Sequence, residues 1–537
     1  MKCMKYRFIA CAVVACWITA ITDLSALEMP WVFADHMVLQ RDMAVPVWGT
    51  TSPGETVTIS FGNQQEQAIA NAKGNWRVTL PPMSADGEGR TLLVKSTNPK
   101  NGTGRKLEIE DVLVGEVWLC AGQSNMWYPL KSCTGGKEAA ATAGNPSIRL
   151  LNRQANAYPS SGAWKPATLA KCTVEKFYSG TWVTDAPGSA LPFSGVAYWF
   201  GKRLQADLKV PIGLINVAVG GTTTEAYTSR AGLLSHPLLR PIIDSSALWV
   251  DNEHVSAWPR KRGRDNLSDW LKHKTPPMPR HPFEPTFLFE SGIQPLVPMA
   301  FRGVIWYQGE SNATDADNVV PVSKAKVRAG IETTIKDWRT HWGREFPFLY
   351  VQLPGMGRPW ELFREVQLEC LEIPNTGMAI SIDVGDPRDV HPRNKRPVGE
   401  RLALWALATT YGKEVVYSGP LVQESGVGSP ASAKATAGRQ ESEGSLLLSF
   451  DHTGTGLATS DRKAPRGFEI AGKDGRYHPA QAIIDGHDVI VSSPQVPEPF
   501  AVRYAWAPYP DCNLVNSAGL PASPFRTDKS EPLSVRD

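Results

Sequence analysis

The chain has 537 residues, of which 42% are hydrophobic and 20% are charged, and its formal net charge is +3. This length exceeds one ordinary domain, and the composition is typical of a globular protein. A net charge so close to zero argues against a nucleic-acid-binding protein, which would carry an excess of basic residues.

The first 26 residues predict a secretory signal peptide. Three basic residues precede an apolar run from Phe8 to Ile21, which is too short for a comfortable membrane span. We therefore expect an exported protein, periplasmic or extracellular. The segment Val13-Val-Ala-Cys16 also resembles a bacterial lipoprotein cleavage box, which is the alternative. No other stretch is long and apolar enough for a membrane span.

Residues 27–110 predict an N-terminal β-sandwich-like domain. Short apolar runs such as Val57-Thr-Ile-Ser-Phe61 alternate with turn signals such as Pro53-Gly54 and Asp86-Gly87. Few of these residues suggest chemistry, so we expect a supporting or glycan-contacting module.

Residues 111–417 predict an α/β domain. Buried-strand patterns alternate with helical patterns, which indicates a parallel sheet with helices on both faces. Two turn-rich segments, at about 130–193 and 251–285, are predicted insertions. The expected strands are 112–120, 212–219, 303–306, 346–352 and 378–383, and the expected helices are 196–208, 324–342, 360–373 and 396–411.

The second insertion carries seven Lys or Arg residues together with Trp258 and Trp270. It would border a pocket for an anionic sugar, or form a solvated loop. The candidate arginines for contact with a substrate carboxylate are Arg260, Arg262, Arg264 and Arg280, and the sequence does not choose among them. Residues 418–537 show β patterns again, after a weakly patterned stretch at 424–444, and predict a C-terminal β-rich region.

Five cysteines remain outside the predicted signal peptide, so at least one thiol is left without an intramolecular partner. Their spacing matches no metal site, and no metal is expected. Cys120 lies in a predicted core strand, where a small buried hydrophobic residue is expected.

Ser124 is the candidate nucleophile. It follows a predicted strand and the turn Ala121-Gly122, at the edge of an open α/β sheet where ligands bind. The alternative is that Ser124 caps the following helix, since serine is a good N-cap residue.

The base that a serine nucleophile needs is expected from His391, which follows the last predicted strand. Asp383, Asp386 and Asp389 precede it, and a carboxylate close in sequence can hold its Nδ1–H. Two further strand ends offer hydrogen-bond donors for an oxyanion. One carries Gly220 and Gly221, and the other carries the amides of Gln308 and Asn312.

Four ordered blocks resemble those of SGNH-type esterases, and the closest resemblance is to the sialate O-acetylesterase family. The blocks are Gly122-Gln-Ser-Asn-Met126, Gly220-Gly-Thr222, Trp306-Tyr-Gln-Gly-Glu-Ser-Asn312 and Asp389-Val-His391. The resemblance extends to Val45-Pro-Val-Trp-Gly49 and to Asn513-Leu-Val-Asn516, so it covers nearly the whole chain after the signal peptide.

The resemblance implies a serine esterase that removes acetyl groups from sugar hydroxyls and needs no cofactor. Ser124 is then the nucleophile and His391 the base. The backbone N–H of Ser124, a glycine of Gly220-Gly221, and the amide of Gln308 or Asn312 are then the oxyanion hole.

One departure from the superfamily pattern concerns the acid of the triad. The usual last block is Asp-x-x-His, but here Arg388 stands three residues before His391. Asp389 is the expected acid, and the alternatives are Asp386, a distant acid such as Glu310, and a Ser–His dyad.

The expected substrate is an O-acetylated sugar or glycan, with O-acetylated sialic acid favoured. An acetylxylan or other polysaccharide deacetylase is the alternative within the class. A non-catalytic secreted glycan-binding protein is the alternative from another class.

Overall fold

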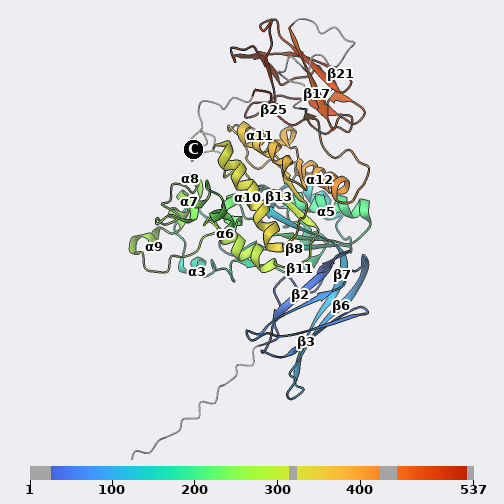
Figure 1. Ribbon diagram of the computed structural model, residues 1–537, viewed down its shortest axis with the longest axis vertical. Helices are drawn as coiled ribbons and strands as arrows, with labels where there is room; N and C mark the ends of the chain where they lie inside the picture. The colour runs from blue at the N-terminus through green and yellow to red at the C-terminus, as the bar shows by residue number, and fades with distance from the viewer. Residues whose placement is uncertain (1–25, 314–322, 424–443, 529–537) are drawn as a thin grey trace, which may run out of the picture.

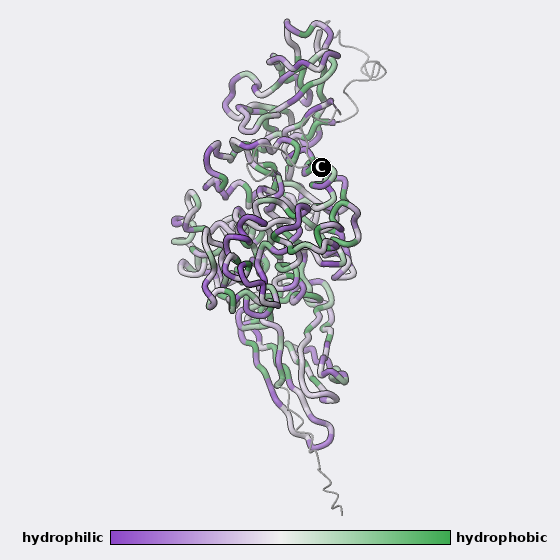
Figure 2. Tube along the Cα trace, turned by 90° about the vertical axis from the view of Figure 1, so that its left-hand side faces the viewer, coloured by the Kyte–Doolittle hydropathy of each residue, from purple (hydrophilic) through white to green (hydrophobic). Residues whose placement is uncertain are grey.

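The computed structural model describes residues 26–313, 323–423 and 444–528, and the fold is that of these residues. The predicted signal peptide and most of the stretch 424–444 lie outside them. Figures 1 and 2 show three parts arranged along the long axis. A narrow N-terminal β region lies at one end, an α/β core in the middle, and a C-terminal β region at the other end.

The N-terminal part is built from antiparallel strands. β2 pairs with β5, β3 pairs with β4 and β6, and β6 pairs with β7, whereas β1 runs parallel to β7. The strands are β1 (Val38–Gln40), β2 (Val45–Thr50), β3 (Thr56–Phe61), β4 (Gln64–Ile69), β5 (Asn75–Leu80), β6 (Asp86–Thr97) and β7 (Gly104–Gly122).

Strand β7 joins the N-terminal part to the core. Its first half alternates exposed and less exposed residues and pairs with β6, while its second half is buried throughout. That second half pairs in parallel with β12 and β13 at the centre of the main sheet, where continuous apolar sequence is typical. The boundary expected between residues 110 and 111 therefore falls inside one strand.

The predicted α/β fold with a parallel sheet is confirmed. The strand order is β11-β8-β12-β7-β13-β14-β15, and every pair is parallel except β11 with β8. Strand β8 lies within the segment 130–193, so this segment contributes a core strand and is not entirely an insertion. The bounds are β8 (Ile148–Asn152), β11 (Trp182–Thr184), β12 (Ile212–Asn216), β13 (Gly303–Tyr307), β14 (Phe348–Val351) and β15 (Thr376–Ala379).

Helices cover both faces of this sheet. Trp118 packs edge-on against Phe200, whereas Trp306 packs against Trp338, and the strand register places Trp118 and Trp306 on opposite faces. Helices α5 (Gly195–Leu208) and α12 (Arg396–Trp405) cover the first face, and α10 (Lys324–Trp342) and α11 (Glu361–Glu369) cover the second. All four correspond to predicted helices.

Shorter helices occupy the connecting segments, and none of the described helices is both long and apolar enough to cross a bilayer. They are α1 (Ser124–Trp127), α2 (Gly136–Ala141), α3 (Pro166–Leu169), α4 (Pro187–Ala190), α6 (Arg230–Ser235), α7 (Arg240–Ile243), α8 (Ala257–Asn266) and α9 (Ser268–His273).

The C-terminal β region has its own small core and contacts the α/β core through loops. The Met356 N–H donates to the carbonyl of Pro508 at 2.9 Å, and the guanidinium of buried Arg364 donates to the carbonyl of Ala507 at 2.5 Å. Its strands are β16 (Leu421–Val422), β17 (Ser445–Asp451), β18 (Leu457–Thr459), β19 (Phe468–Ala471), β20 (Tyr477–Pro479), β21 (Gln481–Asp485), β22 (Asp488–Ser492), β23 (Ala501–Tyr504), β24 (Leu514–Asn516) and β25 (Phe525–Arg526).

Candidate active site

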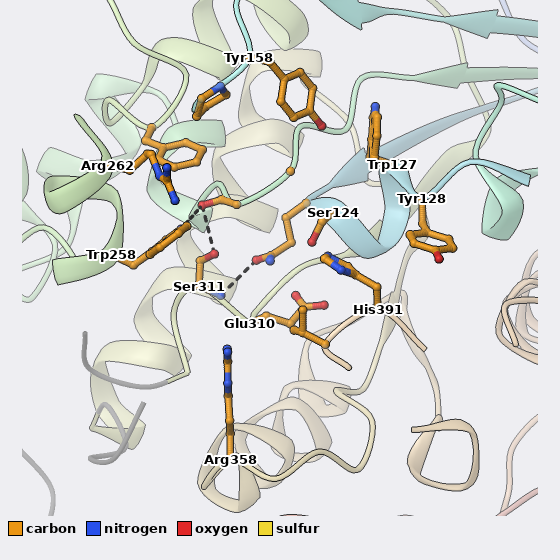
Figure 3. Close-up of a pocket in the computed structure, with 16 residues that line it drawn as sticks. Ser124, Trp127, Tyr128, Tyr158, Trp258, Arg262, Glu310, Ser311, Arg358 and His391 are labelled. Carbon is orange, nitrogen blue, oxygen red and sulfur yellow. Dashed lines mark hydrogen bonds between the residues drawn. The ribbon is translucent and has the colours of Figure 1, made fainter. Parts of the chain in front are cut away.

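A cavity of about 460 Å³ lies beyond the C-terminal ends of the parallel strands, where an open α/β sheet binds its ligands. Figure 3 shows its side chains converging from several loops and from helices α1 and α8. The lining residues are Gln123, Ser124, Trp127, Tyr128, Tyr158, Pro159, Gly220, Gly221, Trp258, Arg262, Phe283, Glu310, Ser311, Arg358, Val390 and His391.

Ser124 is the first residue of helix α1, two residues after strand β7 ends at Gly122. Gly122 has a φ of +131°, and a Cβ there would lie 2.2 Å from the carbonyl oxygen of Tyr307. Glycine therefore permits the close approach of β7 and β13 just before Ser124. The N-cap position belongs to Gln123, and no side chain caps this helix. Ser124 therefore does not act as the cap of helix α1.

His391 lies in the loop after β15, and its imidazole and the hydroxyl of Ser124 point toward one another (Figure 3). The ring stacks on Tyr128 with centroids 5.8 Å apart and an angle of 19° between the planes. Burial lowers the pKa of His391 below its usual value of 6.5, and the nearby charge of Lys395 adds to this shift. The ring is thereby kept neutral, as a base requires.

The two candidate acids use their carboxylates to shape the loop before His391. Oδ1 of Asp389 accepts the backbone N–H of His391 at 2.9 Å and lies 3.9 Å from its Nδ1, which is beyond hydrogen-bond length. Oδ1 of Asp386 accepts the backbone N–H groups of Arg388 and Asp389, at 2.8 and 3.0 Å. Asp389 is thus the nearer of the two, but neither side chain holds the imidazole through a hydrogen bond here.

The glycine pair Gly220-Gly221 lies beside Ser124. A Cβ added to Gly220 would lie 3.4 Å from the Cβ of Ser124. Gly221 has a φ of +79°, and its carbonyl accepts hydrogen bonds from the indole N–H of Trp258 at 3.2 Å and from the hydroxyl of Ser311 at 3.1 Å. Fixing the carbonyl in this way holds the peptide groups of the loop at the cavity wall.

The amides of Gln308 and Asn312, expected from the sequence to face an oxyanion, do not line the cavity. Nε2 of Gln308 donates to Oδ1 of Asn312 at 2.5 Å, and Nδ2 of Asn312 donates to both carboxylate oxygens of Glu225, at 3.1 and 3.0 Å. Their donors are used beneath the cavity, where they join the loop after β13 to the loop after β12.

Gln123 presents an amide to the cavity instead. Its Oε1 accepts the backbone N–H of Ser311 at 3.2 Å and of Gly309 at 3.4 Å. Because two backbone N–H groups hold the oxygen of this amide, its nitrogen points away from them. No acceptor for that nitrogen occurs among the described residues.

A buried polar network lies behind Ser124 and His391. Nδ2 of Asn125 donates to Oε1 of Glu310 and, at 2.9 Å, to the carbonyl of Val390, while Oδ1 of Asn125 accepts from Nζ of Lys395. Asn125 is fully buried, and Lys395 is 1% exposed. Burial raises the pKa of Glu310 and lowers that of Lys395 to about 8.

The predicted insertion 251–285 reaches the cavity through helix α8 and the loop after α9. Arg262 lies 4.8 Å from the ring centroid of Trp258, and both residues line the cavity. The other arginines considered do not line it. Arg260 donates to the carbonyl of Val255, Arg264 pairs with Asp251, and Arg280 pairs with Glu284 and Glu290.

Sequence reasoning missed several cavity residues. Trp127 and Tyr128 lie three and four residues after Ser124, at the end of the short helix that Ser124 begins, so their place near Ser124 was predictable. Tyr158, Phe283 and Arg358 lie in loops far along the chain, and no local pattern marks them.

All five cysteines of the described residues are free, and Cys120 is buried as predicted. In the same part of the chain, no three His, Cys, Asp or Glu side chains gather in a way that would hold a metal ion.

Comparison with known proteins gives consistent matches. Residues 265–407 match the family model "Carbohydrate esterase, sialic acid-specific acetylesterase". A mouse sialate O-acetylesterase is 28% identical over 91% of this chain and 92% of its own length. That of Pongo abelii is 30% identical over 73% of this chain and 72% of its own. A solved carbohydrate acetylesterase from Xanthomonas citri is 35% identical, with a TM-score of 0.73, over 94% of this chain and 100% of that one.

The fold, the cavity at the strand ends and these matches define a carboxylic ester hydrolase that acts on carbohydrate. The matches extend over nearly the whole chain, beyond the α/β core alone. The chain belongs to the sialate O-acetylesterase family.

Proposed function

We propose that this enzyme removes O-acetyl groups from sialic acid through an acetyl-serine intermediate on Ser124. The observation that carries the mechanism is that Ser124, His391 and the Gly220-Gly221 loop line one cavity. A nucleophile, a base held neutral by burial, and backbone N–H groups are the parts that acyl transfer needs.

In the first half of the reaction, His391 accepts the proton of Ser124 while Oγ attacks the acetyl carbonyl carbon. The developing oxyanion is placed against the N–H groups of Ser124 and the glycine loop, and we add the amide of Gln123 as a third donor in place of Gln308 and Asn312. The carbon–oxygen bond to the sugar then breaks, and His391 returns the proton to the sugar oxygen. In the second half, water attacks the acetyl-serine by the same route and releases acetate.

The cavity wall supports a sugar substrate with a negative charge. Trp127, Tyr128, Tyr158 and Trp258 provide flat faces for a sugar ring. Arg262 has no carboxylate partner among the described residues, unlike Arg264 and Arg280, and it stacks on Trp258. A guanidinium free to bind two oxygens is suited to the carboxylate of sialic acid. Arg358, which also lines the cavity, adds positive charge at another edge (Figure 3).

The site of action proposed is outside the cytoplasm, because residues 1–26 have the composition of a signal peptide. A fusion of these residues to an export reporter, compared with the same fusion in which Lys2, Lys5 and Arg7 are replaced by glutamate, tests this. An unprocessed, cytoplasmic reporter in the first fusion would contradict export.

The substrate test is an acetate-release panel with the purified enzyme. We expect kcat/KM for 9-O-acetylated sialic acid to exceed that for acetylated xylo-oligosaccharides. A preference for the xylan fragments by tenfold, about 1.4 kcal/mol of transition-state discrimination, would make a polysaccharide deacetylase the better description. Absence of hydrolysis of p-nitrophenyl acetate as well as of every sugar ester would favour a non-catalytic glycan-binding protein.

A further inference from the structure

The side chain of Asn125 connects three separate catalytic segments. Asn125 follows Ser124 directly, and its Nδ2 donates both to Glu310, in the loop after β13, and to the carbonyl of Val390. Val390 is the neighbour of His391. One amide therefore ties the backbone at the nucleophile to the backbone at the base, across 265 residues of sequence.

The orientation of that amide is fixed by a hydrogen-bond donor at its oxygen end and an acceptor at its nitrogen end. The ammonium of Lys395 donates to the Asn125 oxygen, and the carboxyl group of Glu310 accepts from its nitrogen. An amide placed between a cation and an acceptor carboxyl group cannot flip without placing oxygen against oxygen and nitrogen against nitrogen. Oε2 of Glu310 is buried with no hydrogen-bond partner in the described part of the chain, whereas Oε1 accepts from Asn125.

Lys395 also contributes its charge to the surroundings of the base. Its Nζ lies 5.3 Å from the ring centroid of Tyr128, the residue on which His391 stacks, and 5.4 Å from that of Tyr307. Burial lowers the pKa of Lys395 to about 8, whereas the pKa of His391 lies below 6.5, so the ammonium carries its charge in the pH range in which His391 titrates. The charged and titratable groups facing His391 are Lys395, Asp389, Arg358 and Tyr128. Those facing Lys395 are Glu310, Cys133, Asp389, Tyr128 and Tyr307.

We propose that Asn125 and Lys395 are positioning residues for the esterase reaction. Asn125 holds the Ser124 segment against the His391 segment, and the buried ammonium of Lys395 both fixes this amide and opposes a second positive charge on His391. This assignment rests on the proposed function, because it requires Ser124 and His391 to be the nucleophile and the base. Its consequence is a base that remains neutral at a lower pH than a histidine without this neighbour.

The test measures how the rate of Ser124 phosphorylation by diethyl p-nitrophenyl phosphate depends on pH. This reaction needs the same base but has no substrate-binding step to complicate the profile. The variants are Lys395→Met, Lys395→Arg and Asn125→Leu, each first checked for the wild-type melting transition. Lys395→Gln, which keeps a polar end on a shorter stem, replaces Lys395→Met if the latter does not fold.

We expect Lys395→Met to raise the midpoint of the acidic limb by on the order of half a pH unit to one unit, as removal of a nearby charge should. Lys395→Arg should keep the wild-type midpoint, because it keeps the charge. Asn125→Leu should slow phosphorylation by about tenfold or more at every pH, in keeping with the sensitivity of catalysis to small misplacements.

An unshifted midpoint in Lys395→Met would refute the electrostatic role, even if the rate fell equally at all pH values. A wild-type rate in Asn125→Leu would refute the tether. Failure of the wild-type protein to be phosphorylated at all would instead contradict the proposed function, and this outcome is distinct from the other two.

Discussion

Oδ1 of Asp389 accepts the backbone N–H of His391 at 2.9 Å, yet it lies 3.9 Å from the Nδ1 of the same histidine. The carboxylate thus fixes the course of the loop at His391. A small shift of its side chain would bring it within hydrogen-bond distance of the imidazole. In the apo enzyme such contacts are often longer than in the substrate complex. The relation between these two residues makes Asp389 the stronger candidate for the third catalytic group.

We predict that Asp389→Asn lowers kcat by about ten- to a hundredfold, which is less than the ~10⁴ lost when a fully formed triad loses its carboxylate. Asp386→Asn, the matched control, should cost less, since Asp386 contacts only the backbone of residues 388 and 389. Steady-state kinetics on both variants compares them. A larger loss in Asp386→Asn would transfer the role to Asp386. Wild-type rates in both variants would leave a Ser–His dyad or a distant acid such as Glu310, which also lines the cavity.

The pH dependence of kcat/KM should show an acidic limb with its midpoint below about 6.5, the value for an unperturbed histidine. Burial and the charges of Lys395 and Arg358 lower the pKa of His391, so the neutral, active form persists to lower pH. Activity is therefore present above this pKa and is lost as the pH falls through it. A midpoint above 7, or a flat profile between pH 5 and 8, would contradict a buried histidine base when chemistry limits the rate.

We expect Arg262→Gln to raise KM for O-acetylated sialic acid by about ten- to a hundredfold, since a hydrogen bond to a charged group contributes about 1.5–3 kcal/mol. The change in kcat should be smaller, because binding of a remote carboxylate is largely uniform between ground and transition states. Arg264→Gln is the control, on the same helix but paired with Asp251 outside the cavity.

The same Arg262→Gln variant should hydrolyse p-nitrophenyl acetate normally, since that ester has no carboxylate. An equal effect on both substrates would show that Arg262 supports the fold of the cavity and does not bind the carboxylate of the substrate. Equal effects of Arg262→Gln and Arg264→Gln on KM would likewise refute the assignment.

Gln123→Leu should lower kcat by about a hundredfold with little change in KM, as removal of one oxyanion-hole donor typically does. The physical reason is that Ser311 and Gly309 hold the oxygen of the Gln123 side chain, which leaves its nitrogen for the oxyanion. Gln308→Leu is the comparison variant. Because the Gln308 amide lies beneath the cavity, this substitution should lower stability more than kcat. The opposite ranking of the two variants in kcat would restore Gln308 to the oxyanion hole.

The sequence predicted the parts of this enzyme that depend on local pattern. Buried strands with short turns located the central sheet, and helix α10 begins and ends at the predicted residues, Lys324 and Trp342. The placement of Ser124 and His391 at one cavity was predictable because each follows a strand whose end must lie at the same sheet edge.

The features that escaped prediction depend on contacts between distant segments. Strand β8 lies in a turn-rich segment, and its role becomes visible only through its pairing with β12. Gln308 and Asn312 have the right residue types at a strand end, but their side chains turn away to Thr224 and Glu225. Lys395 carries no local signal of burial, because what buries it is the packing of Tyr128 and Tyr307 around its ammonium.

The central claim is that Ser124 carries the acetyl group. Ser124→Ala should fold normally and lose activity by several powers of ten, on the order of 10⁶ as in a well-studied serine hydrolase. This variant serves as the blank for a direct measurement on the wild-type enzyme.

That measurement is acid quenching of the enzyme during turnover of p-nitrophenyl acetate, followed by peptide mass spectrometry. We predict an acetyl group on the peptide that contains Ser124, formed within the burst of p-nitrophenol release and absent from Ser124→Ala. Acetylation of another residue at the burst rate, or continued turnover by Ser124→Ala at more than about a hundredth of the wild-type rate, would contradict the account.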